Sequence, residues 1–505
     1  MAVNELKAGA ILSYVGIAVN NIVGLVYTPY MLRMLGQSEY GLYSLVASII
    51  AYLTILDLGF GNAIIRYTSK LRAENKQDEQ YSLFGMFLRL YLIIGLIAFC
   101  IGIALYFNVD RLFGRTMTSD ELSQTQVMMA LMVLNLSITF PMSIWGAIIT
   151  AYERFIFQKV INILRIVLNA VVMVILLSMG YKAIAMVVVL TIFNILTLFS
   201  NFWFCRRKLN VKIRFDKIDW ILLREIFTYS VWIFLAGIVD RIYWSSGQFI
   251  IGIYNVPSEI AIFGIAIQLQ AFYSSFSFAI SGVFFPKIVK IVTLEKDMTQ
   301  ISDLFIRIGR IQFYVMSLVF TGFVIFGHKF VILWAGEGYL SAYWMAFAFF
   351  FVILFSSIQT LGNNILQAKG DVKFRTIVIS VTALMVFIVS FPAARYYAGL
   401  GCAIVIAAGI LIGHILILNW YYAKKIGLDI RRFWHEILKL SVLPVALCLI
   451  GMYAYSFIPS DKLAVYFLSI AIYTMLFIYL SYKICFNDYE KSIFKPIVAR
   501  LKSLI

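Results

Sequence analysis

Asp240 and Arg241 are adjacent charged residues near the middle of a long apolar stretch, residues 226–254. At 1.5 Å per helical residue, they lie about 22 Å from the start of that stretch. A lone charge so deep in hydrocarbon costs about 3 kcal/mol, so each side chain should meet water or a partner. Neighbouring residues on a helix point in different directions, which prevents a tight ion pair between these two alone. They can therefore line a polar cavity or bind neighbouring helices as structural contacts.

Five further polar residues lie in or at the ends of apolar stretches: Asn20, Asn21, Asp57, Arg66 and Arg165. Asp57 is followed by Gly59 and Gly61, which weaken a helix and let other groups approach its backbone. Arg66 closes the same stretch. Arg165 lies about 15 Å from the nearest end of its own stretch, the limit that a snorkelling side chain reaches. It can face a cavity or the membrane interface.

Residue patterns typical of catalytic and metal sites are missing from the sequence. It has no glycine-rich phosphate loop before a Lys-Ser/Thr pair and no G-x-S-x-G. The five Cys show no C-x-x-C spacing and the three His are scattered. We therefore expect no enzymatic activity, no ATP hydrolysis, no bound metal and no cofactor.

The elements that position these residues are apolar helices. The chain is 62% hydrophobic and only 13% charged, with a mean hydropathy of +0.91, whereas a soluble domain is about one quarter charged. Stretches of about 20 or more apolar residues cross a membrane as helices. The sequence predicts an all-α integral membrane protein with fourteen spans, near residues 8–35, 40–65, 83–107, 126–152, 155–177, 183–204, 226–254, 260–285, 306–326, 339–367, 376–396, 399–423, 437–457 and 463–484.

Charge is distributed unequally across this arrangement. Of the 42 Lys and Arg residues, 34 fall on the side that holds both termini and 7 on the other. Cytoplasmic loops retain Lys and Arg during insertion, which predicts cytoplasmic termini in a bacterial inner membrane. The net charge of +17 is then an insertion signal that also attracts anionic lipid. We expect no nucleic-acid partner, because no soluble basic domain is present.

A faint internal repeat relates the two halves of the chain. A shift of 220 residues aligns Ser38-Glu39 with Ser258-Glu259 and Asn20-Asn21 with Asp240-Arg241. Both halves begin in the cytoplasm, so the repeat is parallel. The predicted domains are a six-helix bundle (1–205), a basic cytoplasmic linker with an interfacial helix opened by Asp216 (206–225), a second six-helix bundle (226–423), and an interfacial helix opened by Asp429 with helices 13–14 and a cytoplasmic tail (424–505).

Several motifs carry a family resemblance. The run 35–43 (LGQSEYGLY) is followed by 56–62 (LDLGFGN), 152–155 (YERF) and 366–370 (LQAKG). The sequence resembles bacterial polysaccharide (Wzx-type) flippases of the multidrug/oligosaccharidyl-lipid/polysaccharide exporter superfamily, over nearly its whole length. The resemblance implies two pseudo-symmetric bundles around a central lumen that opens alternately to each face. It also implies a polyprenyl-pyrophosphate-linked oligosaccharide as cargo.

If the cargo is such a lipid-linked oligosaccharide, Arg241 would contact its phosphate or sugar, because a guanidinium group pairs well with phosphate. Asp240, Asn20 and Asn21 would shape the site, and Asp57 or Asp240 could take a coupling H+ or Na+. Membrane lipids, a polysaccharide polymerase and glycosyltransferases are candidate partners. The alternatives are a multidrug/cation antiporter of the same superfamily and a non-transporting scaffold for glycan assembly. A membrane glycosyltransferase is disfavoured, because no large acidic loop could hold its metal.

Overall fold

The computed structural model describes residues 2–216, 220–294, 298–369, 373–458 and 462–492. Over these residues the protein is all-helical, as predicted, and contains no strand. Ten helical segments in the described part are long and apolar enough to cross a membrane. An eleventh is formed if α11 (Ser341–Ser357) and α12 (Thr360–Lys369), which meet at a 47° bend, count as one span.

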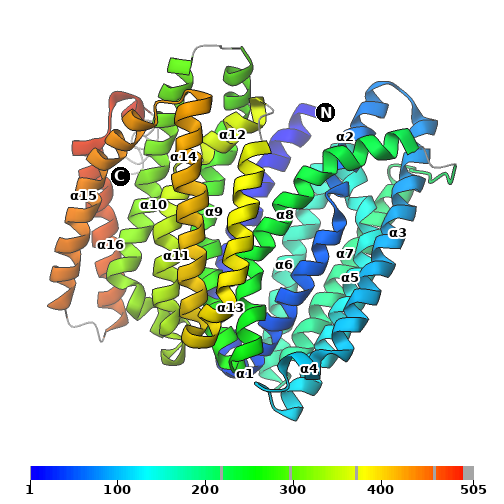
Figure 1. Cartoon of the computed structure of the whole chain (residues 1–505), viewed down its shortest axis with the longest axis horizontal. Coiled ribbons are helices and arrows are strands. Elements are labelled where there is room, and N and C mark those ends of the chain that lie inside the picture. The colour runs from blue at the N-terminus through cyan, green and yellow to red at the C-terminus, as the bar shows by residue number, and fades with distance from the viewer. Residues whose placement is uncertain (1, 217–219, 295–297, 370–372, 459–461, 493–505) are drawn as a thin grey trace. The chain divides into compact units, whose positions relative to one another are not determined.

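Two of these segments each contain two predicted spans. α1 (Ala2–Leu53) has a non-helical residue at Gly36, with φ of 77°, between the predicted spans 8–35 and 40–65. α13 (Lys373–Ile410) is interrupted at Ala398, with φ of 47°, between the predicted spans 376–396 and 399–423. Figure 1 shows α1 running from the N-terminus to a turn at its lower end and back towards α2. The predicted outer turns at these two positions therefore correspond to breaks in the helices.

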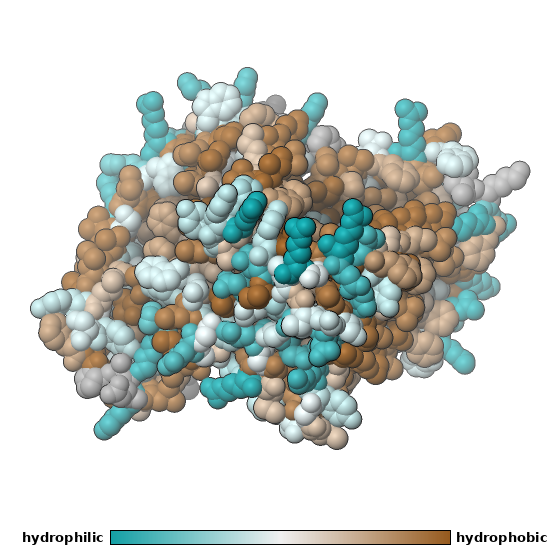
Figure 2. Space-filling model, turned by 60° about the horizontal axis from the view of Figure 1, so that its bottom comes forward, coloured by the Kyte–Doolittle hydropathy of each residue, from teal (hydrophilic) through white to brown (hydrophobic). Residues whose placement is uncertain are grey.

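The other elements follow the remaining predicted stretches. They are η1 (Thr54–Asp57), α2 (Phe60–Ala73), α3 (Gln77–Phe107), α4 (Val109–Phe113), α5 (Ser119–Ala151), α6 (Phe155–Ser178), α7 (Ala183–Arg207), α8 (Trp220–Tyr254), α9 (Pro257–Leu294), α10 (Met298–Trp334), η2 (Glu337–Tyr339), η3 (Leu411–Ile417), α14 (Leu418–Tyr421), η4 (Tyr422–Ile426), α15 (Ile430–Ser456), α16 (Leu463–Leu480) and η5 (Ser481–Cys485). Many large apolar side chains on them are exposed. Figure 2 shows hydrophobic residues over much of the visible surface, as a multi-pass membrane protein requires.

The chain forms two compact units. Unit 1 comprises Met1–Ile265 and Ala383–Val405, and unit 2 comprises Ala266–Thr382 and Ile406–Ile505. The contacts thus place α8 in unit 1, although the sequence repeat assigns it to the second half. The division into two repeated six-helix bundles stays a prediction.

Small residues allow close helix packing within unit 1. α3, α5 and α7 lie side by side (Figure 1). A Cβ atom added at Gly95 of α3 would lie 2.8 Å from the Ser137 carbonyl oxygen of α5. The first part of α1 runs parallel to α6, because Gly9 faces Phe155 and Gly16 faces Ile163. Glycine lets these backbones approach, which is the usual way that helices associate in a membrane.

The linker after α7 forms no helix over residues 210–216. It lies across α3: a Cβ added at Gly85 would be 1.9 Å from the Arg214 carbonyl oxygen. Ser82 donates a hydrogen bond to the Asp216 side chain, and Arg89 donates one of 2.6 Å to the Asp216 carbonyl oxygen. The helix predicted to start at Asp216 includes residues 217–219, outside the described residues, and Trp220 already belongs to α8. Asp429 caps α15 by accepting a hydrogen bond from the Arg432 amide, and α15 continues from Ile430 to Ser456 through the predicted span 437–457. The interfacial position of its first turns stays a prediction.

A buried ion network joins three segments of unit 2. The Arg310 guanidinium on α10 donates to both carboxylate oxygens of Glu490, at 2.6 and 3.0 Å. It also donates to Glu436 on α15 at 2.7 Å and to the Cys485 carbonyl oxygen at 3.1 Å. Arg310 is 7% exposed and Glu490 1%. The network therefore fixes the segment after α16 against α10 and α15.

Candidate functional site

The candidate site is built around a break in the second predicted span of unit 1. Residues Thr54–Asp57 form one 3-10 turn, Leu58 and Gly59 are left-handed with φ of 53° and 74°, and α2 begins at Phe60. Glycine adopts this conformation at little cost, whereas a left-handed leucine costs about 1–3 kcal/mol. Non-helical backbone at membrane depth is tolerated where it is buried in protein or lines a cavity. Broken helices are also where transporters bind substrates and ions.

Asp57 lies at the end of this 3-10 turn and binds a residue from α3. It accepts a hydrogen bond of 2.8 Å from the Tyr91 hydroxyl. Tyr91 is fully buried, and its ring packs edge-on against Phe60, which in turn packs against Phe227 of α8. The half-buried carboxylate of Asp57 is thus held by the Tyr91 hydroxyl and by the backbone amides of Gly59 and Gly61, which are all neutral donors. An acidic side chain held in this way can accept a proton or bind a small cation.

Asp240 and Arg241 lie on α8, which packs against α1, η1 and α2 on both sides of this break. α8 runs antiparallel to the chain from α1 to α2: Gly252 lies next to Leu45, and Phe227 packs on Phe60. α8 also contacts η1 directly. The pair lies between these two contacts along α8.

Among the described residues, the two α8 charges interact only with each other. Val239 and Tyr243 form the buried face of α8, while Asp240 is exposed and Arg241 is half-buried. Neither side chain makes an ion pair or hydrogen bond with any described residue, and Asp240 interacts electrostatically only with Arg241 beside it. The interpretation as structural contacts between helices therefore finds no support in the described residues.

The remaining predicted residues fall into two places. Asn20 is exposed and Asn21 half-buried on the first part of α1, and Arg165 is half-buried on the adjacent, parallel α6. The Gly16–Ile163 contact puts these three within about two turns of one another along the pair. Arg66 is exposed on α2, with its guanidinium carbon 5.8 Å from the Tyr67 ring, so it lies towards the predicted cytoplasmic end. No described hydrogen bond or ion pair joins Arg165 to the Asp57 break.

Sequence reasoning missed Tyr91 and the left-handed Leu58. The paired glycines after Asp57 did indicate a weakened helix, but no local pattern shows which residue of another helix reaches the carboxylate. A tyrosine inside an otherwise apolar span was the available signal. Among the described residues, no group of three or more His, Cys, Asp or Glu is placed to hold a metal ion.

Comparison with known proteins decides the family. Residues 6–292, more than half of the chain, match the family described as "Polysaccharide biosynthesis protein". The chain belongs to this family. A "Putative O-antigen transporter" of Shigella flexneri is 19% identical over 431 residues, which cover 81% of this chain and 96% of that protein. The resemblance drawn from the motifs at 35–43 and 56–62 is therefore confirmed.

Solved structures share the fold. "Lipid II flippase MurJ, inward closed conformation" has a TM-score of 0.68 and 16% identity, covering 94% of this chain and 98% of that chain. An inward-facing "multidrug resistance MATE family transporter of the MOP superfamily" has a TM-score of 0.60 and 12% identity, covering 86% and 99%. The chain thus has the fold of this transporter superfamily. The relatives in sequence and in structure are named as transporters, not enzymes.

Proposed function

We propose that this protein is a flippase that moves a polyprenyl-pyrophosphate-linked oligosaccharide from the inner to the outer leaflet of the bacterial cytoplasmic membrane. Membership of the polysaccharide biosynthesis family and the relative named for O-antigen transport support this cargo class. The single observation that carries the proposal is the Asp240–Arg241 pair on α8, to which no other described residue supplies an ion pair or a hydrogen bond. A charge within a membrane span is costly unless water, a ligand or another charge compensates it.

In this mechanism the headgroup enters from the cytoplasmic side while the polyprenyl chain stays in lipid. The protein then alternates between inward-open and outward-open states, with both termini in the cytoplasm. Arg241 binds phosphate or sugar oxygens, and Asp240, Asn20 and Asn21 contact hydroxyl groups. Arg66 attracts the anionic headgroup at the inner end, and Arg165 lines the approach. Asp57 takes the coupling cation, H+ or Na+, because Tyr91 holds its carboxylate with a neutral donor.

Replacement of Arg241 tests the site. Arg241→Ala should lower glycan export about 10- to 100-fold, because a charged hydrogen bond contributes about 1.5–3 kcal/mol. Arg241→Lys should restore part of it, since a point charge replaces a planar fork. Arg111 lies on the predicted outer side and is exposed, so Arg111→Ala is the matched control and should leave export unchanged.

A structural role for Arg241 gives a different pattern. Arg241→Ala would then lower protein abundance, and the double replacement Arg241→Ala with Asp240→Ala or Asp57→Ala would restore both abundance and export. Full export by a stable Arg241→Ala protein would contradict both roles.

The second candidate is a multidrug/cation antiporter. The likeness of fold to a multidrug transporter and the two carboxylates Asp57 and Asp240 favour it. Saturable binding of cationic dyes by the purified protein, lost in Asp240→Asn, would support the antiporter over the flippase.

A further inference from the structure

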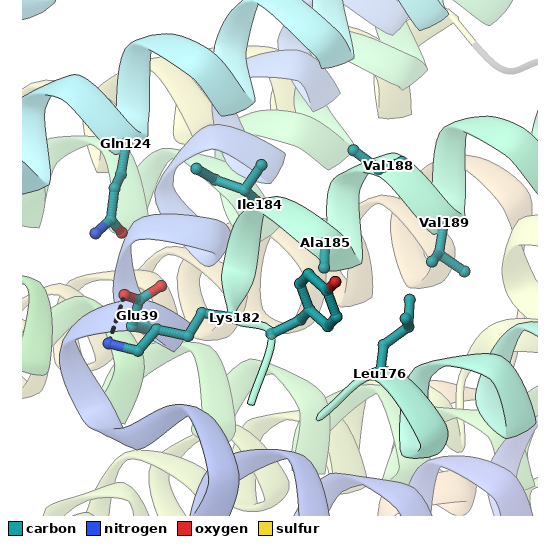
Figure 3. A pocket seen from close by; sticks show the side chains of 9 residues that line it. Glu39, Gln124, Leu176, Lys182, Ile184, Ala185, Val188 and Val189 are labelled. Atoms are coloured by element: carbon teal, nitrogen blue, oxygen red, sulfur yellow. Dashed lines mark ion pairs between the residues drawn. The ribbon is translucent and has the colours of Figure 1, made fainter. Parts of the chain in front are cut away.

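A recess of about 480 Å³ lies in unit 1, apart from the Asp57 break. Figure 3 shows it between α1, the start of α7 and the end of α6, with Gln124 of α5 at its edge. Its walls are apolar side chains from two helices, Leu176 on α6 and Ile184, Val188 and Val189 on α7. The volume lies within the range of small-molecule sites, and the lining is more apolar than a sugar or nucleotide site requires.

One end of the recess carries a fixed ion pair. The Glu39 carboxylate lies 3.4 Å from Lys182 Nζ (Figure 3) and accepts a hydrogen bond of 3.3 Å from the Ala183 amide at the start of α7. Glu39 is 8% exposed, whereas the Lys182 side chain is 64% exposed. The rim is therefore close to neutral, with an ammonium group that a ligand can still reach.

The recess continues into an apolar surface. Val171 and Ile175 on α6 and Val188 and Ile192 on α7 are all exposed, and α6 packs beside α7. In a multi-pass membrane protein, such a surface faces hydrocarbon. The recess thus has a polar rim at one end and a lipid-facing apolar surface leading into it. This arrangement matches a phospholipid, which has a polar headgroup and apolar acyl chains.

We propose that this recess binds a zwitterionic phospholipid of the outer leaflet, with one acyl chain between α6 and α7 and its phosphate on Lys182. The leaflet rests on the proposed topology, which puts Glu39 and Lys182 on the outer side. The near-neutral Glu39–Lys182 pair favours a zwitterionic headgroup. A pyrophosphate carries more negative charge and would be repelled by the Glu39 carboxylate beside Lys182. The bound lipid fills the space beside the turn of α1 at Gly36.

Native mass spectrometry of the full-length, delipidated protein tests this site. Phosphatidylethanolamine should bind more tightly than phosphatidylglycerol with the same acyl chains. Val188→Trp should fill the recess and weaken phosphatidylethanolamine binding at least about tenfold, the effect of losing roughly two buried methylene groups. Leu96→Trp is the matched control, because it adds the same side chain at an exposed apolar position of α3, which contributes no residue to the recess lining. Lys182→Gln should remove the preference between the two headgroups.

Equal effects of Val188→Trp and Leu96→Trp would overturn the proposal, as would tighter binding of phosphatidylglycerol or of a polyprenyl pyrophosphate. If Val188→Trp does not yield folded protein, Ala185→Leu makes a smaller intrusion into the same recess and should give the same direction of change. The readout is lipid affinity and not flipping. The lipid-binding result can therefore be interpreted even if the protein does not flip a lipid-linked oligosaccharide. In the same way, a failure to bind phosphatidylethanolamine would not argue against flipping.

Discussion

Removing the Arg310 guanidinium should destabilise the protein more than removing any exposed arginine. In Arg310→Ala, Glu490 loses two hydrogen bonds and its charge partner while it remains almost fully buried. Breaking a buried pair in this way costs about 3–5 kcal/mol, because a charge is left without compensation. Glu436, the third member, has a side chain that is 30% exposed and can turn to water.

Arg432 provides the matched control. It pairs with Asp303 at 2.7 Å, but the two side chains are 54% and 38% exposed. Exposed pairs contribute about 0–1 kcal/mol. Arg432→Ala should therefore lower the free energy of unfolding by less than about 1 kcal/mol, although the two ion pairs have similar lengths.

The assay is unfolding of the purified protein by denaturing detergent in mixed micelles, followed by tryptophan fluorescence. A third variant removes both buried partners: Arg310→Leu with Glu490→Leu should recover most of the stability lost in Arg310→Ala, because no buried charge remains. Equal losses for Arg310→Ala and Arg432→Ala would refute the reasoning. No recovery in the double variant would show that the hydrogen bond to Cys485, and not the charge, holds the segment after α16.

Three further predictions follow from the packing, the site and the topology. Gly85→Val should displace the linker at Arg214 and destabilise the protein by about 1–3 kcal/mol, measured in the same micelle assay, whereas Gly322→Ala, which has open space, should be neutral or slightly stabilising. Tyr91→Phe should keep the fold but change the dependence of transport on H+ or Na+ concentration; an unchanged ion dependence would remove Asp57 from coupling. Reporter fusions at Asn108 and Glu337 should read as external and those at Asn75, Lys212 and Lys373 as internal, and two reversed sites would overturn the charge argument.

Much of the architecture could be predicted from the sequence, because each membrane span must satisfy its own backbone. Apolar length alone therefore located the helices, including those that turn at Gly36 and Ala398. The grouping into units could not be predicted, since it depends on which apolar faces meet. α8 packs on α1 and η1 through contacts such as Gly252 with Leu45, and hydropathy does not distinguish these from lipid-facing residues.

The candidate site was predicted in part. Charges at midplane depth are rare enough that Asp57, Asp240 and Arg241 stand out in the sequence. Their partners do not stand out, because Tyr91 and Asp57 are 34 residues apart and meet only through helix packing. The contacts of the linker could not be predicted either. Asp216 is a residue type that often caps a helix, yet its side chain accepts a hydrogen bond from Ser82 on α3.

The most direct test of the central claim is flipping by the purified protein in proteoliposomes. A polyprenyl-pyrophosphate-linked oligosaccharide is placed in one leaflet, and its arrival in the other is read by an impermeant glycosidase. The wild-type protein should move the headgroup, and Arg241→Ala should slow this about 10- to 100-fold while Arg111→Ala does not. No movement above protein-free vesicles, or equal movement by the wild type and Arg241→Ala, would contradict the account.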